Sequence, residues 1–242
     1  MLNLSELLTE LHFITYEIAL LGLFVTASFI MVSRDWRSLI MALLVQYILV
    51  GLILARIVRP DIAFLKIMVG AFICPGLFLS ARQVSISALS ISLPRQTGQN
   101  MGLMSYLSMW WQNFSVLDLL RGIERYRETR STGFTFQLIL VLLIILISMR
   151  LSVNFPLPDM APNVTTAIYW LILAGLTTLT LTENPIQVGH GLLTIFMGFD
   201  LYYSTLEPSF LITGLWATVN LLTALAIGYL IIARGSAPED DI

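Results

Sequence analysis

The sequence has few charged residues. Aspartate, glutamate, lysine and arginine together make up 12% of the 242 residues, against about 25% in soluble domains. Hydrophobic residues make up 57%. These proportions exclude an ordinary soluble domain and predict an integral membrane protein. The formal net charge is −2, so the sequence also lacks the basic excess of nucleic-acid-binding proteins, and we expect no nucleic-acid partner.

Cysteine and histidine are also scarce. The single cysteine, Cys74, excludes a disulfide framework and a cysteine-based metal site. The two histidines, His12 and His190, are too few for a membrane haem protein. The sequence contains no nucleotide-binding loop and no nucleophile triad. We therefore expect neither a cofactor nor a metal site.

Apolar segments of about 20 residues, the length needed to cross a bilayer, recur along the chain. The sequence predicts seven of them, at residues 12–32, 37–58, 60–81, 134–154, 164–181, 185–205 and 208–233. Most connections are short, so neighbouring helices are expected to run antiparallel. The predicted fold class is an all-α, polytopic membrane protein with about seven transmembrane helices in a bundle. The N-terminus lacks a basic region and a cleavage site, which favours a short amphipathic lead over a signal peptide.

One connection, residues 82–133, is long. Apolar residues, tryptophans among them, recur at helical spacing over residues 103–120, and arginines follow. This pattern predicts an amphipathic helix, which suits either the membrane interface or the surface of a neighbouring subunit. The connection divides the chain into an N-terminal three-helix membrane segment (1–81), an interfacial or partner-binding connection, and a C-terminal four-helix membrane segment with a short acidic tail (134–242).

Arginines are distributed unevenly between the two sides of the predicted bundle. With seven spans, nine arginines fall on the side that holds Arg34, Arg37, the long connection and the C-terminal tail, and three fall on the other side. Cytoplasmic loops carry an excess of basic residues. We therefore expect the N-terminus outside and the C-terminus in the cytoplasm.

The only lysine, Lys66, lies inside the third apolar segment. A charge inside a bilayer is costly, so an intramembrane lysine suggests ion handling. Counted from the predicted span ends, Lys66 lies about 9 Å, and Asp200 in the sixth segment about 7–8 Å, from the same membrane edge. We predict that both side chains face the bundle interior and are coupled, directly or through water. The alternative is that Lys66, close to Asp61 in sequence, extends its stem back to the interface.

Further polar residues lie within or beside the predicted spans. Glu17 is in the outer half of the first segment, where interfacial solvation is the alternative to an ion role. Gln46 and Asn220 lie near the middle of the second and seventh segments, either as interhelical hydrogen-bonding groups or as groups that hold water in a proton path. His190, between two glycines, either relays protons or is a satisfied hydrogen-bonding group. Glu183 is expected to cap the next helix, with proton uptake at the cytoplasmic mouth as the alternative.

Two stretches together carry a family pattern. Residues 33–82 have an arginine before the second span, a glutamine within it, and then a lysine, a proline and a closing arginine: Arg37, Gln46, Lys66, Pro75 and Arg82. Residues 184–234 form the last two predicted spans. Both stretches resemble the E component of hydrogenase-4-type membrane complexes, which is related to the K-type subunit of respiratory complex I and to the C-type subunit of multisubunit sodium/proton antiporters. That family has acidic residues at the positions of Asp200 and Asn220, so this chain differs at Asn220, and residues 82–133 are an insertion.

The resemblance implies a small, non-catalytic and cofactor-free subunit of a complex I-related, redox-driven proton or sodium pump in the bacterial inner membrane. Its implied partners are antiporter-like and quinone-proximal membrane subunits, together with lipid. The implied site is a hydrophilic axis within the membrane. Its expected members are Lys66, Asp200, His190, Glu17, Gln46 and Asn220. The alternatives are a stand-alone small transporter and a purely structural subunit of a membrane complex.

Overall fold

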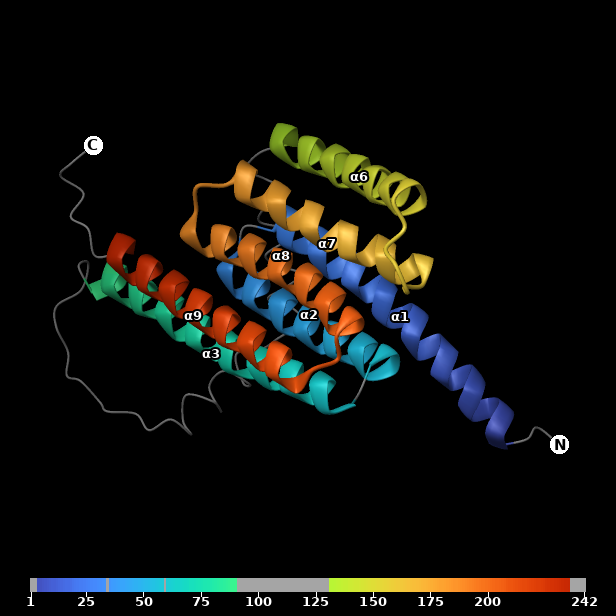
Figure 1. Cartoon of the computed structure of the whole chain (residues 1–242). Coiled ribbons are helices and arrows are strands. Elements are labelled where there is room, and N and C mark those ends of the chain that lie inside the picture. The colour runs from blue at the N-terminus through green and yellow to red at the C-terminus, as the bar shows by residue number, and fades with distance from the viewer. Residues whose placement is uncertain (1–3, 34, 59, 91–130, 236–242) are drawn as a thin grey trace.

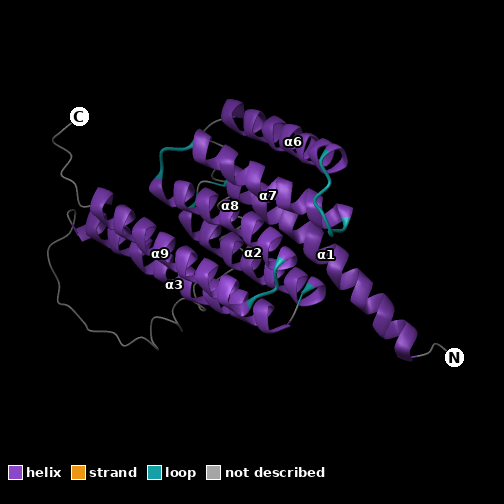
Figure 2. Ribbon diagram, viewed as in Figure 1, coloured by secondary structure: helices purple, strands orange, loops and turns teal. Residues whose placement is uncertain are grey.

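The computed structural model describes residues 4–33, 35–58, 60–90 and 131–235. These residues form seven helices and no strand (Figure 2). The helices are α1 (Leu4–Val32), α2 (Trp36–Ile57), α3 (Pro60–Ser90), α6 (Ser131–Asn154), α7 (Pro162–Leu181), α8 (Pro185–Leu206) and α9 (Phe210–Gly235). Each predicted span corresponds to one helix, so the predicted all-helical, polytopic class is confirmed.

The structure corrects one boundary of the long connection. Residues 82–90, which the sequence pattern assigns to the connection, are the last turns of α3. Nothing in residues 82–90 breaks a helix, since the segment contains neither proline nor glycine, and the helix therefore continues past the apolar stretch. The predicted amphipathic helix over residues 103–120 lies outside the described residues.

Side-chain caps fix where the helices begin. The carboxylate of Asp35 accepts hydrogen bonds from the backbone N–H of Ser38 at 3.3 Å and from its hydroxyl at 2.8 Å, and so caps α2. The side chain of Asn184 caps α8, and Pro185 takes the first helical position, where its missing N–H costs nothing. The expected cap at Glu183 is therefore wrong by one residue. An asparagine is the better cap because its side-chain oxygen reaches the second helical N–H.

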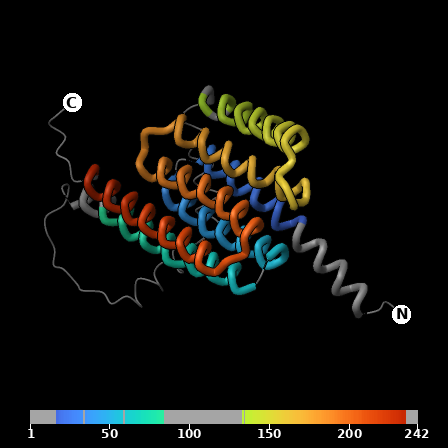
Figure 3. Tube along the Cα trace, in the orientation of Figure 1, coloured from blue at the N-terminus to red at the C-terminus, as the bar shows by residue number. Residues whose placement is uncertain are grey.

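The helices form two layers (Figures 1 and 3). Helices α6, α7, α8 and α9 lie side by side in one layer, and α1, α2 and α3 form the other. Across the layers α1 packs on α7, α2 on α8, and α3 on α9. The N-terminal and C-terminal membrane segments thus pack face to face in one bundle, with α2 and α8 at its centre.

Five of the described helices are long and apolar enough to cross a membrane: α2, α3, α6, α7 and α9. The described apolar part of α1, Glu17–Val32, is shorter. Helix α8 has the length but carries polar residues along its buried face. The chain is therefore an integral membrane protein in which α8, with its polar buried face, packs on α7, α9 and α2.

The tightest helix contact joins α7 and α8 through two glycines. A Cβ added to Gly175 would lie 2.5 Å from the carbonyl oxygen of Gly191, and one added to Gly191 would lie 2.9 Å from that of Gly175. Without these hydrogen-only side chains the two backbones could not approach this closely. The contact holds α8 close to α7, and with it the polar face that α8 turns into the bundle.

Candidate functional site

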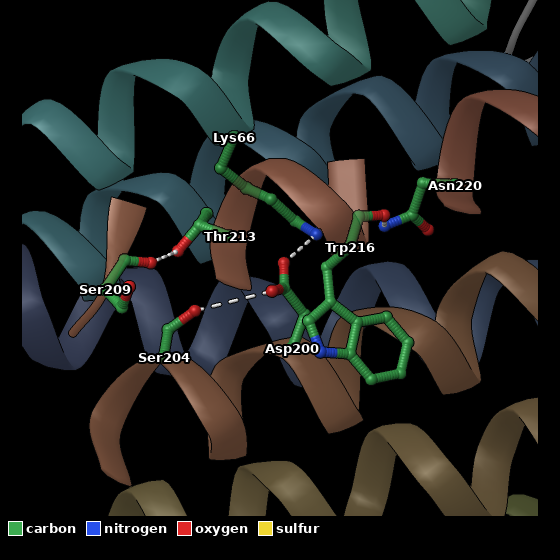
Figure 4. A network of polar contacts seen from close by, with 7 residues as sticks. All are labelled: Lys66, Asp200, Ser204, Ser209, Thr213, Trp216 and Asn220. Atoms are coloured by element: carbon green, nitrogen blue, oxygen red, sulfur yellow. Dashed lines mark hydrogen bonds and ion pairs between the residues drawn. The ribbon is translucent and has the colours of Figure 1, made fainter. Parts of the chain in front are cut away.

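Lys66 and Asp200 form an ion pair inside the bundle. Lys66 projects from α3 and Asp200 from α8, and the ammonium nitrogen Nζ donates to the carboxylate oxygen Oδ2 (Figure 4). The two side chains are 2% and 1% exposed. The predicted coupling is confirmed, and the alternative of a lysine extended to the interface is wrong. Each charge offsets the desolvation of the other, which is why both can be buried.

Two neighbours that the sequence interpretation did not select complete the immediate surroundings of the pair. The Ser204 hydroxyl, one helical turn beyond Asp200, donates to its second carboxylate oxygen, Oδ1, at 3.3 Å. The ring of Tyr47 in α2 has its centroid 5.3 Å from Lys66 Nζ, within the range of a cation–π contact. Gly70 makes room for this ring, because a Cβ there would lie 2.5 Å from the Cβ of Tyr47. The i,i+4 spacing of Asp200 and Ser204 was a readable signal, whereas no sequence signal pointed to Tyr47.

Asn220 lies on α9, in the part of the bundle toward which Lys66 extends (Figure 4). Its side-chain Nδ2 donates to the backbone carbonyl of Trp216 at 3.0 Å. Its Oδ1 is buried and has no hydrogen-bond partner within the described part of the chain. The prediction of a buried amide in the middle of the last helix is confirmed, but one of its two polar ends is left unsatisfied by protein atoms.

A second polar cluster lies nearer the start of α8. The Nδ1 of His190 is 2.6 Å from the carbonyl oxygen of Ile186. Because a carbonyl only accepts, Nδ1 carries the hydrogen, and Nε2 of the neutral ring is an acceptor. Nε2 is buried and forms no hydrogen bond of good geometry with a described residue, although the Leu39 backbone lies nearby. The ring is therefore only half satisfied by the protein.

Gln46 and Thr194 connect α2 with α8 at this level. The Thr194 hydroxyl donates to the backbone carbonyl of His190 at 2.8 Å and approaches Gln46 Oε1 at 3.4 Å. Gln46 Nε2 is buried with no partner among the described residues. Gln46 is followed in sequence by Tyr47, whose ring contacts Lys66, so α2 links the second cluster to the ion pair.

Glu17 is not part of these clusters. Its carboxylate is half-buried and accepts a hydrogen bond from Asn163 Nδ2, at the start of α7, at 3.4 Å. The structure joins Lys66 with Asp200, and His190 with Gln46 through Thr194, while Glu17 stays at the rim of the bundle. Interfacial solvation, the alternative given for Glu17, fits this position.

A pocket of about 520 Å³ opens at the α7–α8 connection. Most of its lining is polar and comes from α6, α7, the connection and α8. These polar residues are Gln137, Thr178, Thr182, Glu183, Asn184 and Gln187. Gln187 is buried, accepts a hydrogen bond from the Thr182 hydroxyl, and donates to the carbonyl of Ser33 at the end of α1. It lies one turn before His190 on α8 and so connects the pocket with the second cluster.

The described residues contain no group of three or more histidine, cysteine, aspartate or glutamate side chains that could hold a metal ion. Cys74 is buried and free. The site thus offers an ion pair beside a hydroxyl and an aromatic ring, and a second cluster of imidazole, amide and hydroxyl groups. Carboxyl, ammonium and imidazole groups can gain or lose a proton, and amides and hydroxyls can donate and accept hydrogen bonds. Comparison with protein-family models, with curated proteins and with solved structures found no match to this chain.

Proposed function

We propose that this chain is a membrane subunit of a complex I-related, redox-driven ion pump, and that Lys66 and Asp200 carry charge within it. The observation that carries the proposal is the buried ion pair between α3 and α8. Replacing a buried ion pair by apolar residues of similar volume is often neutral or stabilising, so stability alone is a weak reason for having one. Ionisable residues inside membranes mark ion and proton pathways.

The surroundings of the pair suit a change of protonation. Adding a proton to one member of a coupled pair changes the proton affinity of the other. When a proton neutralises Asp200, the ammonium of Lys66 keeps the Tyr47 ring as a partner. The Ser204 hydroxyl, which can donate or accept, remains beside the aspartic acid in either state. The pair is thus supported in both its charged and its protonated forms.

The kind of complex is proposed from the sequence pattern that includes Arg37, Gln46 and Lys66. Helices α6 and α9 expose apolar side chains that suit contact with lipid or with antiporter-like and quinone-proximal subunits. The bacterial inner-membrane location is proposed from the family resemblance. The arginine distribution supports an orientation with the N-terminus outside and the α7–α8 connection in the cytoplasm.

The same ion pair favours one other function, that of a purely structural subunit. Lys66 and Asp200 belong to different layers of the bundle, so their contact also holds the layers together. In that case the pair would be needed for assembly and would have no part in translocation.

Purification of the tagged chain in mild detergent, followed by mass spectrometry of what stays bound, tests the assignment to a complex. We expect antiporter-like and quinone-proximal membrane subunits. Recovery of this chain alone would reject the assignment and favour a stand-alone transporter.

Ion translocation by the recovered complex in vesicles then separates the two roles of the pair. We expect Lys66→Met combined with Asp200→Leu to leave assembly intact and to abolish translocation. The matched control is Phe64→Ala on the exposed face of α3, two residues from Lys66, which should change neither. If the double variant fails to assemble, the pair is structural. If it assembles and pumps like the parent, the pair has no part in translocation.

A further inference from the structure

We infer that the pocket at the α7–α8 connection is the water entrance to the Lys66–Asp200 pair, and that a hydrated path joins the two through His190, Gln46 and Tyr47. The inference rests on the proposed function, because the path matters only if the pair exchanges protons with one side of the membrane. It adds the side from which protons arrive and the residues that conduct them.

The first observation is the pocket itself. It has a volume of about 520 Å³ and a mostly polar lining of hydroxyl, amide and carboxylate groups. At its inner edge lies Gln187, whose side chain is buried and joins the Thr182 hydroxyl to the Ser33 carbonyl. A roomy site with several polar groups holds water readily.

The second observation is a row of buried polar atoms that protein atoms leave unsatisfied. His190 Nε2, Gln46 Nε2 and the Tyr47 hydroxyl are all buried without a hydrogen-bond partner among the described residues. An unsatisfied buried polar group costs free energy, and nearly all such groups in proteins are paired with protein or with water. Ordered water is a partner that can supply the missing hydrogen bonds of these atoms.

The order of these groups gives the path its direction. On α8, His190 lies about 4.5 Å, Thr194 about 10 Å and Asp200 about 20 Å beyond Gln187 along the helix axis. Gln46 approaches Thr194, and its neighbour Tyr47 contacts Lys66. The row therefore starts at the pocket and ends at the ion pair. The indole N–H of Trp170 is also buried without a hydrogen-bond partner in the part of the chain that the structure describes. It lies in α7, where its ring stacks on Phe24 of α1, and is not needed for the row.

The chemistry of the row suits protons carried by water. The acceptor Nε2 of His190, the amide of Gln46 and the hydroxyls of Thr194 and Tyr47 can each orient a water molecule as donor or acceptor. A proton taken from water at the pocket would end on the Asp200 carboxylate and leave Lys66 as an ammonium ion. Each proton that reaches Asp200 is matched by one proton that enters the path from water at the pocket.

Accessibility of introduced cysteines to silver ions tests the path. In the full-length protein in membranes, with Cys74→Ser as the background, Thr194→Cys lies on the path. Leu193→Cys is the matched control, because Leu193 is the adjacent residue and is 0% exposed within the apolar core. Silver ions are small enough for a narrow water path. A thiol that has reacted with silver is protected from later alkylation in denaturant, so the loss of alkylation measures the silver reaction.

We expect silver added on the α7–α8 side to block Thr194→Cys at least about tenfold faster than Leu193→Cys, because thiols react as thiolates and apolar surroundings suppress the thiolate. Equal rates at the two positions, or faster block from the opposite side, would overturn the inference. Replacing threonine by cysteine is nearly isosteric, so the test does not depend on a disruptive variant. Gln187→Cys at the pocket should react fastest and also with bulkier thiol reagents.

The measurement separates this inference from the proposed function. Fast, one-sided block at Thr194→Cys in a protein whose translocation survives loss of the ion pair would keep the hydrated path and reject the pumping role of the pair. Slow block together with lost translocation in the double variant would keep the role of the pair and reject this entrance.

Discussion

Helices α6 and α8 have similar lengths, 24 and 22 residues, yet they lie in opposite surroundings. Helix α6 lies at the edge of its layer and exposes leucine and isoleucine over most of its circumference. Helix α8 lies between α7 and α9 and packs on α2. Its buried residues include Gln187, His190, Thr194, Asp200 and Ser204.

The few buried polar residues of α6 also face protein. Ser148 and Ser152 are buried, and the Ser152 hydroxyl accepts a hydrogen bond from Thr166 of α7 at 2.8 Å. Leu142 and Val153 on the other face are 59% and 76% exposed. In both helices the buried polar groups face protein, and the exposed face carries large apolar side chains. The difference is that α8 packs on α7, α9 and α2, and the face that it buries against them can carry charge.

The largest loss of stability is expected when one charge of the ion pair is removed from α8. Asp200→Ala leaves the Lys66 ammonium buried without its partner, which should cost about 3–5 kcal/mol of stability. Unfolding by titration with a denaturing detergent in mixed micelles measures the loss. The control is Lys66→Met combined with Asp200→Leu, which removes both charges at similar volume and should restore most of the stability. A double variant as unstable as Asp200→Ala would contradict this account.

The opposite change places a charge on the exposed face of α6. Leu142 lies near the middle of the helix, so Leu142→Arg should cost about 2.5–3.5 kcal/mol of membrane-insertion free energy. The fraction of chains inserted in isolated membranes measures this. Leu142→Met, which keeps the apolar face, should insert like the parent. Normal insertion of the arginine variant would mean that this face of α6 meets a polar partner rather than lipid.

Long apolar runs predicted where the helices lie, although only five of the described helices are long and apolar enough to cross a membrane. Lys66 and Asp200 could be paired by counting residues from the span ends, since depth in a membrane is a single coordinate. Their direct contact also depends on which face each helix turns inward, which span counting does not determine.

Other parts of the site could not be predicted in this way. Tyr47 reaches Lys66 only because α2 lies between α3 and α8 in the bundle and because Gly70 leaves room for its ring. Glu17 has a plausible depth but lies on the wrong helix, at the rim beside Asn163. Lateral arrangement is a two-dimensional packing problem, and a single sequence holds little information on it.

Glycine contacts hold α8 tightly against its neighbours, whereas α6 is packed less tightly. Gly175→Ala places a methyl group 2.5 Å from the Gly191 carbonyl oxygen and should force α7 and α8 apart, at a cost of about 1–3 kcal/mol. Gly76→Ala in α3 is the matched control, since nothing lies within 4 Å of the added carbon. There the change should be neutral or slightly stabilising. Thermal unfolding in mild detergent compares the two, and equal destabilisation would show that the α7–α8 contact is not tight.

The smallest effect is expected from Gln46→Leu, which tests whether the polar residues of α8 and α2 contribute to stability. Gln46→Leu removes an amide whose Nε2 has no partner among the described residues, together with one long contact from Thr194. A single hydrogen bond contributes only about 0.5–1.5 kcal/mol, and losing an unsatisfied donor offsets part of that, so stability should change by less than about 1 kcal/mol. Leu43→Ala, in the apolar core of the same helix, should cost about 2–5 kcal/mol by comparison. Thermal unfolding of both variants checks this ratio, and a Gln46→Leu loss as large as that of Leu43→Ala would make the amide a structural member of the core.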